Sequence, residues 1–288
     1  MIQKTIASPI SIEGIGAHSG KRSRIDILPA SEDSGILFMR TDIDGDNSIA
    51  ADFANVSETT LCTRLSNKSG VSVSMVEHVL ATLYGFQISN AIIKVDGEEI
   101  PVLDGSSAVF AREIASVGII AQSKKRKCLK ILKTVKISYE EKWSSLSPAD
   151  HLVLNLSCDF SKKGLKTTPF SYDLSQDNFA TEIAPARTFG FFDDVEYLHK
   201  NNLALGASME NTVVFDANGN AMNEEGLRFD NEPIRHKMLD IIGDLSLSGY
   251  MIIGQYDGFC SGHKLNNMLL HALFSASSTD AFCFVTDC

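Results

Sequence analysis

The stretch that decides the architecture runs from Arg235 to Leu245 and reads RHKMLDIIGDL. His236, Asp240 and Asp244 recur every four residues among apolar residues, a spacing that predicts a helix with one polar row on a largely buried surface. Two residues four positions apart in a helix lie about 40° and ~6 Å from each other, which suits two ligands of one metal ion. A surface His–Asp pair is the alternative, but the apolar neighbours leave this helix few exposed positions, and buried carboxylates need partners.

A second helix is predicted within VSVSMVEHVLATLYG, residues 71–85, with Ser74 as its N-cap and Glu77 completing a capping box. Packing of this otherwise apolar helix does not require Glu77 or His78. A catalytic zinc site uses three protein ligands and keeps a fourth position open for water. We therefore expect His78 to be the third ligand and Glu77 to be the base for that water. The alternative is a glutamate that caps its own helix beside a half-buried histidine.

Two further segments carry candidate catalytic groups. CSGHKLNN, residues 260–267, places His263 after Ser-Gly and before a helix, and a histidine near a carboxylate can protonate a leaving amine. APARTFGFFDD, residues 184–194, places Thr188 in a glycine-containing loop, where its hydroxyl could donate to an oxyanion. A structural histidine and an ordinary loop threonine are the alternatives that the residues alone leave open.

The order of the predicted elements repeats along the chain. Helix, apolar strand, turn and helix run from Ser74 to Gly118 and again from Pro233 to Ala276. This order predicts an α+β fold of two similar domains, each a helix layer packed on a β-sheet, with the active site at the domain interface. The polar run from Ser123 to Lys127 reads as a linker, so we expect an N-terminal domain over residues 1–124 and a C-terminal domain over residues 125–288.

Composition limits the partners and the compartment. The net charge of −10 over 288 residues argues against nucleic-acid binding, which needs a basic surface. The N-terminus has no apolar signal region, and no apolar run approaches the ~18 residues of a membrane span. The six cysteines are scattered without a CxxC pair, which favours free thiols in a reducing cytoplasm over a disulfide framework or a cysteine zinc site.

Seven ordered segments together resemble one family. They are VEHVLATL, LDGSS, APARTFGF, LALGAS followed by EN, GLRF, RHKMLDIIGDL and SGHKLNN, and the similarity runs from GIGAHSG near residue 14 to LNNMLLHAL near residue 273. These segments resemble the UDP-3-O-acyl-N-acetylglucosamine deacetylase family, zinc amidases that commit a sugar nucleotide to lipid A biosynthesis. The resemblance implies two α+β domains with the site between them, which agrees with the repeated element order.

The resemblance also implies roles for individual residues. Zinc would be held by His78, His236 and Asp240, with ferrous iron as an alternative that a His2Asp site accepts. Glu77 would be the general base and His263 the general acid. Thr188 would help bind the oxyanion, and Phe189 would contact the substrate. Asp244 would orient His263 and stabilise its charge. Lys237 would contact the substrate or its developing charge.

An acyl passage and a nucleotide site are implied as well. The passage would be lined by Ala17, Val195, Ala204, Ala207 and Met209. Asp194, Lys142 and Phe160 would lie toward the sugar and nucleotide, with Phe160 able to stack on uracil. We expect the substrate to be the only partner, with no nucleic acid and no membrane insertion, and the chain to act as a cytoplasmic monomer.

Some positions depart from the family pattern. Cys260 stands where lysine is frequent, Asp193 where a basic residue is common, Ala207 where glycine is frequent, and Pro233 where an aromatic residue precedes the metal helix. Cys260 and Asp193 both disfavour a diphosphate, so an amidase acting on another N-acyl sugar is the second hypothesis. A binding protein that uses a metal only to join two domains is the third.

Overall fold

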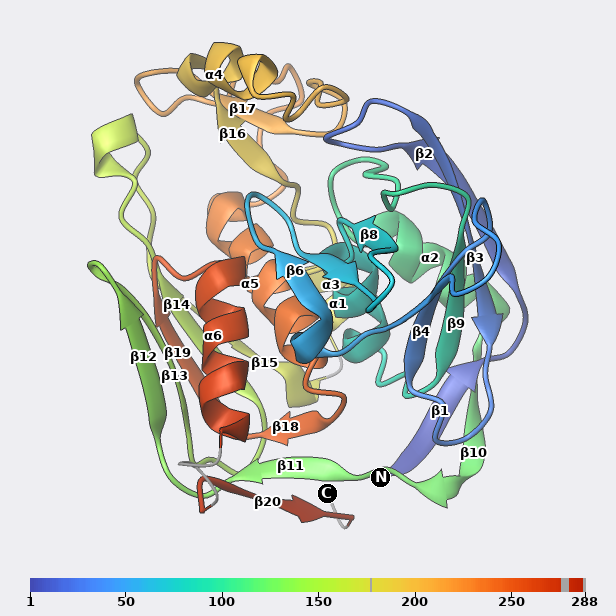
Figure 1. Cartoon of the computed structure of the whole chain (residues 1–288). Coiled ribbons are helices and arrows are strands. Elements are labelled where there is room, and N and C mark those ends of the chain that lie inside the picture. The colour runs from blue at the N-terminus through green and yellow to red at the C-terminus, as the bar shows by residue number, and fades with distance from the viewer. Residues whose placement is uncertain (177, 276–279, 287–288) are drawn as a thin grey trace.

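The protein is described by a computed structural model that covers residues 1–176, 178–275 and 280–286. Two five-stranded sheets face each other, and the long helices lie between them (Figure 1). This arrangement confirms the predicted α+β class with two similar halves.

The N-terminal sheet has the strand order β2-β3-β9-β4-β5, in which only the β9–β4 pair is parallel. Apolar residues alternate along its central strands; in β3, for example, Ile25 and Ile27 are buried, as expected for a sheet with one face on the core. The sheet and its helices comprise β2 (Ile10–Ile15), β3 (Arg22–Pro29), β4 (Ile36–Arg40), β5 (Ser48–Ala50), α1 (Glu77–Gly85), β9 (Ala91–Val95) and α2 (Ala108–Val117).

The C-terminal sheet repeats this topology strand for strand. Its order is β12-β13-β19-β14-β15, and again the one parallel pair joins the third strand to the fourth, β19 to β14. In both halves the central strand of the sheet follows a long helix and precedes a second one. The elements are β12 (Val135–Tyr139), β13 (Lys142–Ser147), β14 (Val153–Ser157), β15 (Phe170–Asp173), α5 (Glu232–Ser246), β19 (Gln255–Phe259) and α6 (His263–Phe274).

Smaller elements complete the fold. One group bridges the lower ends of the two halves in Figure 1: β1 (Ile2–Ile6), β10 (Ile119–Lys125), β11 (Cys128–Ile131), β18 (Met251–Ile253) and β20 (Phe282–Val285). The N-terminal half carries an insert of η1 (Phe53–Asn55), β6 (Val56–Glu58), β7 (Arg64–Ser66) and β8 (Ser72–Ser74). The C-terminal half carries η2 (Ser161–Lys163), η3 (Leu174–Gln176), α3 (Phe179–Glu182), β16 (Phe189–Phe191), η4 (Phe192–Asp194), α4 (Val195–Lys200) and β17 (Val213–Phe215).

Three local predictions were wrong. Ser74 belongs to β8 and does not cap α1, whose N-cap is Val76 without a side-chain hydrogen bond. The single apolar strand expected between the two helices of Pro233–Ala276 is instead two strands in different sheets, β18 and β19, because the chain turns at Gly254. The polar segment from Ser123 to Lys127, expected to be a linker, lies mostly in β10, which pairs with β1 as far as Lys125. Hydrogen bonding to the neighbouring strand holds this segment extended despite its charged side chains. The boundary between residues 124 and 125 stays a prediction.

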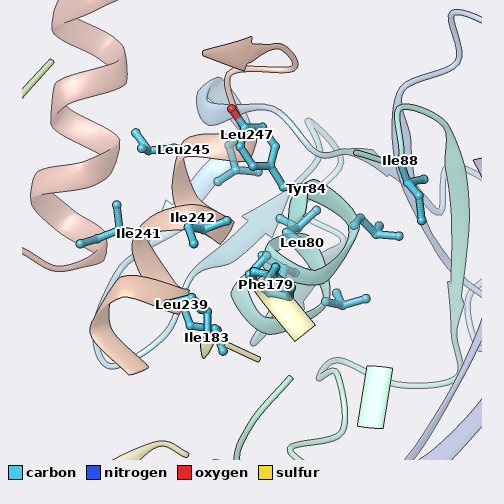
Figure 2. Packing of buried hydrophobic residues seen from close by; sticks show 14 of the residues in the cluster. Leu80, Tyr84, Ile88, Phe179, Ile183, Leu239, Ile241, Ile242, Leu245 and Leu247 are labelled. Atoms are coloured by element: carbon cyan, nitrogen blue, oxygen red, sulfur yellow. The ribbon is translucent and has the colours of Figure 1, made fainter. Parts of the chain in front are cut away.

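The core joins the two halves through α1 and α5. Leu80 of α1 lies beside Ile242 of α5, and Tyr84 lies beside Leu247 at the end of α5 (Figure 2). Leu80, Leu239 and Ile242 are almost fully buried. The helices approach closely at Gly243, where an added Cβ would lie 2.2 Å from the carbonyl oxygen of Glu77. A glycine is therefore required there to bring the first turn of α1 against α5.

The cysteines match the expectation of free thiols at all but one of the positions described below. Cys62, Cys158, Cys260 and Cys283 are free thiols, as expected, whereas Cys128 is disulfide-bonded, against that expectation. Within the described ranges, no helix combines the length and the hydrophobicity that crossing a membrane requires.

Candidate metal centre and active site

Three predicted ligands converge at the contact between α1 and α5. Nε2 of His78 lies 3.7 Å from Oδ1 of Asp240, and Nε2 of His236 lies 3.6 Å from the same oxygen. One donor atom from each residue lies within 4.8 Å of the others. Two neutral imidazoles and a carboxylate at this spacing match the donor set of a catalytic divalent-metal site.

The surroundings of these residues fit a cation. Oδ1 of Asp240 is buried and has no hydrogen-bond partner among the described residues, an arrangement that a positive ion would satisfy. Burial, followed by the nearby His236, lowers the pKa of His78 to about 3, so its imidazole is neutral and able to bind a metal. Nδ1 of His236 lies 3.0 Å from the carbonyl oxygen of Ala186, which favours Nδ1–H donation and leaves Nε2 free as a ligand atom.

Glu77 begins α1 immediately before His78 and is almost fully buried. The backbone N–H of Thr63 donates to its Oε2 over 3.0 Å. Burial, reinforced by the carboxylates of Asp240 and Asp244, raises the pKa of Glu77 to about 8. A divalent cation bound beside Glu77 would lower that pKa again, because nearby positive charge favours the carboxylate.

His263 is the first residue of α6 and faces Glu77 from the other half of the chain. Its Nε2 lies 4.0 Å from Oε1 of Glu77, and its Nδ1 lies 2.9 Å from Oδ2 of Asp244. Burial alone would lower the pKa of His263, but the negative charges of Asp244, Glu77 and Asp240 outweigh it and raise the pKa to about 10. The imidazole is therefore a protonated acid at neutral pH.

Two residues that hold Asp244 were not foreseen. The hydroxyl of Thr63 donates to Oδ1 of Asp244 over 2.6 Å, and Nδ2 of Asn266 donates to Oδ2 over 2.8 Å. The hydroxyl of Tyr256 in turn donates to Oδ1 of Asn266 over 2.7 Å. Asn266 stands three residues after His263 in α6, so helical spacing could have indicated it. Thr63 comes from the insert of the other half, and no local pattern points to it.

Glu77, His263 and the three candidate metal ligands line a cavity of about 420 Å³, whereas Asp244 does not reach its wall. Thr188, Phe189, Lys237 and Lys142 also line it, together with Cys260 and the segment that leads into α6. The backbone of Thr188 is fixed on both sides, because its N–H donates to Gly105 and its carbonyl accepts from Val213. The cavity wall therefore joins groups from both halves.

A buried ion-pair network anchors the Thr188 loop to α5. Glu232 is completely buried and accepts hydrogen bonds from the backbone N–H and the Nε of Arg187 over 3.0 and 2.8 Å. Arg187 immediately precedes Thr188, and Glu232 lies one turn before His236. This network was not foreseen, although Glu232 is a buried carboxylate next to a predicted site helix. It holds the loop that supplies Ala186 and Thr188 to the site.

A second cavity, of about 830 Å³, shares Leu61 with the catalytic cavity. None of the five residues predicted for the acyl passage lines it, but several of their chain neighbours do. The backbone N–H of Gly206 donates to Ala17, and that of Ala204 to Nδ1 of His18, so the segment after α4 is joined to the turn before β3. The neighbours His18, Leu198, Leu203 and Leu205 line the cavity. The roles of Ala17, Val195, Ala204, Ala207 and Met209 stay predictions.

The residues predicted near the nucleotide have defined surroundings. Phe160 packs edge-on against Phe189 at a centroid distance of 5.6 Å. Oδ1 of Asp194 lies 2.6 Å from Nζ of Lys163, a partner that the sequence reading did not include. Their contacts with substrate stay predictions.

Comparison with known proteins agrees with this geometry. Residues 3–275 match the family model described as UDP-3-O-acyl N-acetylglycosamine deacetylase. The chain is 44% identical over 286 residues to the UDP-3-O-acyl-N-acetylglucosamine deacetylase of Idiomarina loihiensis, covering 99% of this chain and 92% of that protein. It is 42% identical to the enzyme of the same name from a Psychrobacter species, covering 96% of this chain and 93% of that protein. It is 41% identical to the enzyme from Actinobacillus succinogenes, covering 94% of this chain and 89% of that protein. With the family model matching nearly the whole chain, the protein belongs to the UDP-3-O-acyl-N-acetylglucosamine deacetylase family.

Proposed function

We propose that this protein hydrolyses the N-acetyl amide of UDP-3-O-(3-hydroxyacyl)-N-acetylglucosamine, giving acetate and the free amine, the committed step of lipid A biosynthesis. The observation that carries the proposal is the placement of Glu77 and His263 4.0 Å apart, on the wall of the cavity into which the candidate metal ligands also project. A base and an acid on one wall are what amide hydrolysis requires.

Zinc is the ion that best fits the donor set, and His78, His236 and Asp240 would hold it. When bound, a zinc ion would polarise the acetamide carbonyl and lower the pKa of an attacking water from ~15.7 toward ~7. Ferrous iron is the second ion that two histidines and a carboxylate accept. Metal analysis of protein purified from its own host would distinguish the two.

Two side chains of this protein then carry out the two proton transfers of the reaction. Glu77 accepts a proton from the water as it attacks the amide carbon. The hydroxyl of Thr188 donates to the oxyanion that forms on the carbonyl. His263, protonated through its contact with Asp244, gives its Nε2 proton to the leaving nitrogen. Acetate and the free amine of glucosamine are the products.

The remaining wall residues would bind the substrate. Lys237 and Lys142 place positive charge at the cavity, which suits the phosphates of a nucleotide sugar. Phe189 and Phe160 would contact the sugar and uracil, and Asp194 would lie nearby. Ala17, Val195, Ala204, Ala207 and Met209 would line the acyl passage. We further propose that the chain acts as a cytoplasmic monomer. The four free thiols among the described residues support a reducing compartment, whereas the disulfide at Cys128 does not.

The test is release of free amine from this substrate by metal-stripped protein, with and without one equivalent of zinc. We expect activity only in the presence of zinc. Protein that is folded and binds zinc but releases no amine would contradict the proposal. A parallel assay on the N-acyl sugar without its nucleotide addresses the second hypothesis, which Cys260 in the cavity wall keeps open: equal turnover of both compounds would favour a different amidase.

A further inference from the structure

A pair of free thiols lies at the edge of the catalytic cavity. Strands β14 and β19 are parallel neighbours whose last paired residues are Ser157 and Phe259. Cys158 and Cys260 each directly follow the last residue of these strands, and both are free. The N–H of Cys260 donates to the carbonyl of Ser157 over 2.8 Å, so the two chains stay side by side at this point.

The geometry suits a disulfide. Neighbouring strands lie about 4.7–4.9 Å apart, inside the 4.4–6.8 Å range of Cα separations that disulfides span. The Cys260 side chain contributes to the raised pKa of Cys158, which requires the two side chains to lie close together. In addition, the N–H of Asp159 donates to Sγ of Cys260 over 3.1 Å, which places that sulfur over the strand that carries Cys158.

The two thiols have different reactivities. Cys260 is partly exposed and lines the catalytic cavity, so an oxidant that enters the cavity can reach its thiol. Cys158 is buried, and burial raises its pKa to about 12. Cys260 would therefore react first with an oxidant, and Cys158 would resolve the product.

The position of Cys260 connects the pair to catalysis. Its backbone φ is +46°, a left-handed conformation that non-glycine residues rarely adopt. Ser261 and Gly262 follow, and then His263 begins α6. A bond that draws Cys260 toward β14 would move the short segment that sets the position of the proposed acid.

We propose that Cys158 and Cys260 form a reversible disulfide that reduces the activity of the adjacent catalytic site. The oxidant is a low-molecular-weight disulfide or a peroxide. With a disulfide, the Cys260 thiolate displaces one thiol to form a mixed disulfide, and the Cys158 sulfur displaces the second thiol. With hydrogen peroxide, Cys260 becomes a sulfenic acid, which Cys158 converts to the disulfide with release of water. The effect on activity rests on the proposed deacetylase function, whereas the disulfide itself does not.

The experiment treats the full-length protein, first reduced and then desalted, with oxidised glutathione or hydrogen peroxide. Peptide mapping without reduction should find the peptides of Cys158 and Cys260 joined. Deacetylase activity should fall, by as much as about a hundredfold if the His263 segment moves by ~1 Å, and dithiothreitol should restore it. The proposal would be overturned if the peptide map finds Cys260 only as a stable glutathione adduct. It would also be overturned if Cys158 and Cys260 are joined while deacetylase activity is unchanged.

Two variants serve as controls. Cys158→Ala, which leaves the cavity wall intact, should keep its activity under the same oxidant. Cys283→Ser removes a free thiol of β20 and should behave like the wild type. Both retain Cys128, so its disulfide responds to dithiothreitol in the same way in every sample. If reduced protein lacks deacetylase activity, the proposed function fails, but the peptide map still decides whether the pair forms.

Discussion

The two halves of this chain share one sheet topology and contribute different chemistry. The N-terminal half supplies Glu77 and His78 from the first turn of α1. The C-terminal half supplies His236, Asp240 and Asp244 from α5 and a histidine from the start of α6. The counterpart of α6 in the N-terminal half is α2, and the serine before it, Ser107, donates to the backbone carbonyl of His78 over 2.9 Å.

The difference shows how a repeated fold acquires one site. Corresponding helices occupy corresponding places, but on one side the start of the helix carries an acid and on the other it carries a serine that supports a ligand. Neither half holds the complete set of proposed catalytic groups, so the proposed mechanism requires the packing of α1 against α5. The fold provides the positions, and individual residues provide the chemistry.

The largest expected loss of activity comes from removing a proposed metal ligand from either half. We expect His78→Ala and His236→Ala each to lower zinc affinity by more than the ~10–100-fold typical of residues that only orient a ligand, and to reduce activity to background. Zinc titration and the amine-release assay measure both effects. His271→Ala, on the far part of α6 against Phe53, is the matched control. Unchanged affinity in His78→Ala would mean that the C-terminal half binds the ion alone.

The proposed base and acid come from opposite halves and should be equally necessary. Glu77→Gln and His263→Gln should each lower turnover by about 10²–10⁴-fold, the usual contribution of general acid–base catalysis, while the protein still binds zinc. The double variant should lose less than the product of the single losses, because the two groups act in one reaction. A loss below tenfold in either single variant would remove that residue from the proposed mechanism.

The contact between the halves can be disturbed without touching a catalytic side chain. In Gly243→Ala the new Cβ would lie 2.2 Å from the Glu77 carbonyl, so the helices must separate. Overpacking of this kind costs about 1–3 kcal/mol of unfolding free energy, more than the ~1 kcal/mol that alanine gains over glycine in a helix. Urea denaturation and turnover should both report the change. Gly97→Ala, where a Cβ meets no atom within 4 Å, should alter neither.

Much of the site was predictable because it lies on helices. The four-residue spacing in RHKMLDIIGDL placed His236, Asp240 and Asp244 correctly on one side of α5, since helical periodicity is a local property of the sequence. The Glu77-His78 pair stood out because its helix is otherwise apolar. The repeated element order also indicated two similar halves, although no residue-level repeat is visible.

The remaining parts depend on contacts between distant segments. Thr63 reaches Asp244 across 181 positions, and Arg187 reaches Glu232 across 45, so neither pairing has a local signal. The wrong N-cap at Ser74 has the same origin: β8 pairs with β7, and this tertiary pairing outweighs the capping-box pattern. The pairing of Lys125 with Ile2 of β1 likewise has no local signal, because the charged residues around Lys125 are as compatible with a linker as with an edge strand.

The contact between Asp244 and His263 can be tested through pH. The acid must be protonated, and Asp244 with the other carboxylates raises the pKa of His263 to about 10. In Asp244→Asn this pKa should fall toward ~6.5, so the alkaline decline of kcat/KM should move to lower pH. A bound cation lowers the pKa in both proteins, and the direction of the difference stays the same. An unchanged alkaline decline in the variant would show that His263 is not the group that limits the rate there.

The smallest expected effect concerns Thr63, a residue of the N-terminal insert whose side chain contacts Asp244 of the C-terminal half. Thr63 donates its backbone N–H to Glu77 and its hydroxyl to Asp244. Thr63→Val keeps the shape and the N–H and removes only the hydroxyl. Asp244 retains its contacts with His263 and Asn266, so we expect kcat/KM to fall only about five- to tenfold, since one hydrogen bond contributes ~1–1.5 kcal/mol. Thr41→Val, at an exposed position of the same half, is the control. A loss as large as that of His263→Gln would mean that Asp244 depends on the N-terminal half for its position, and that the two halves share the acid as well as the metal.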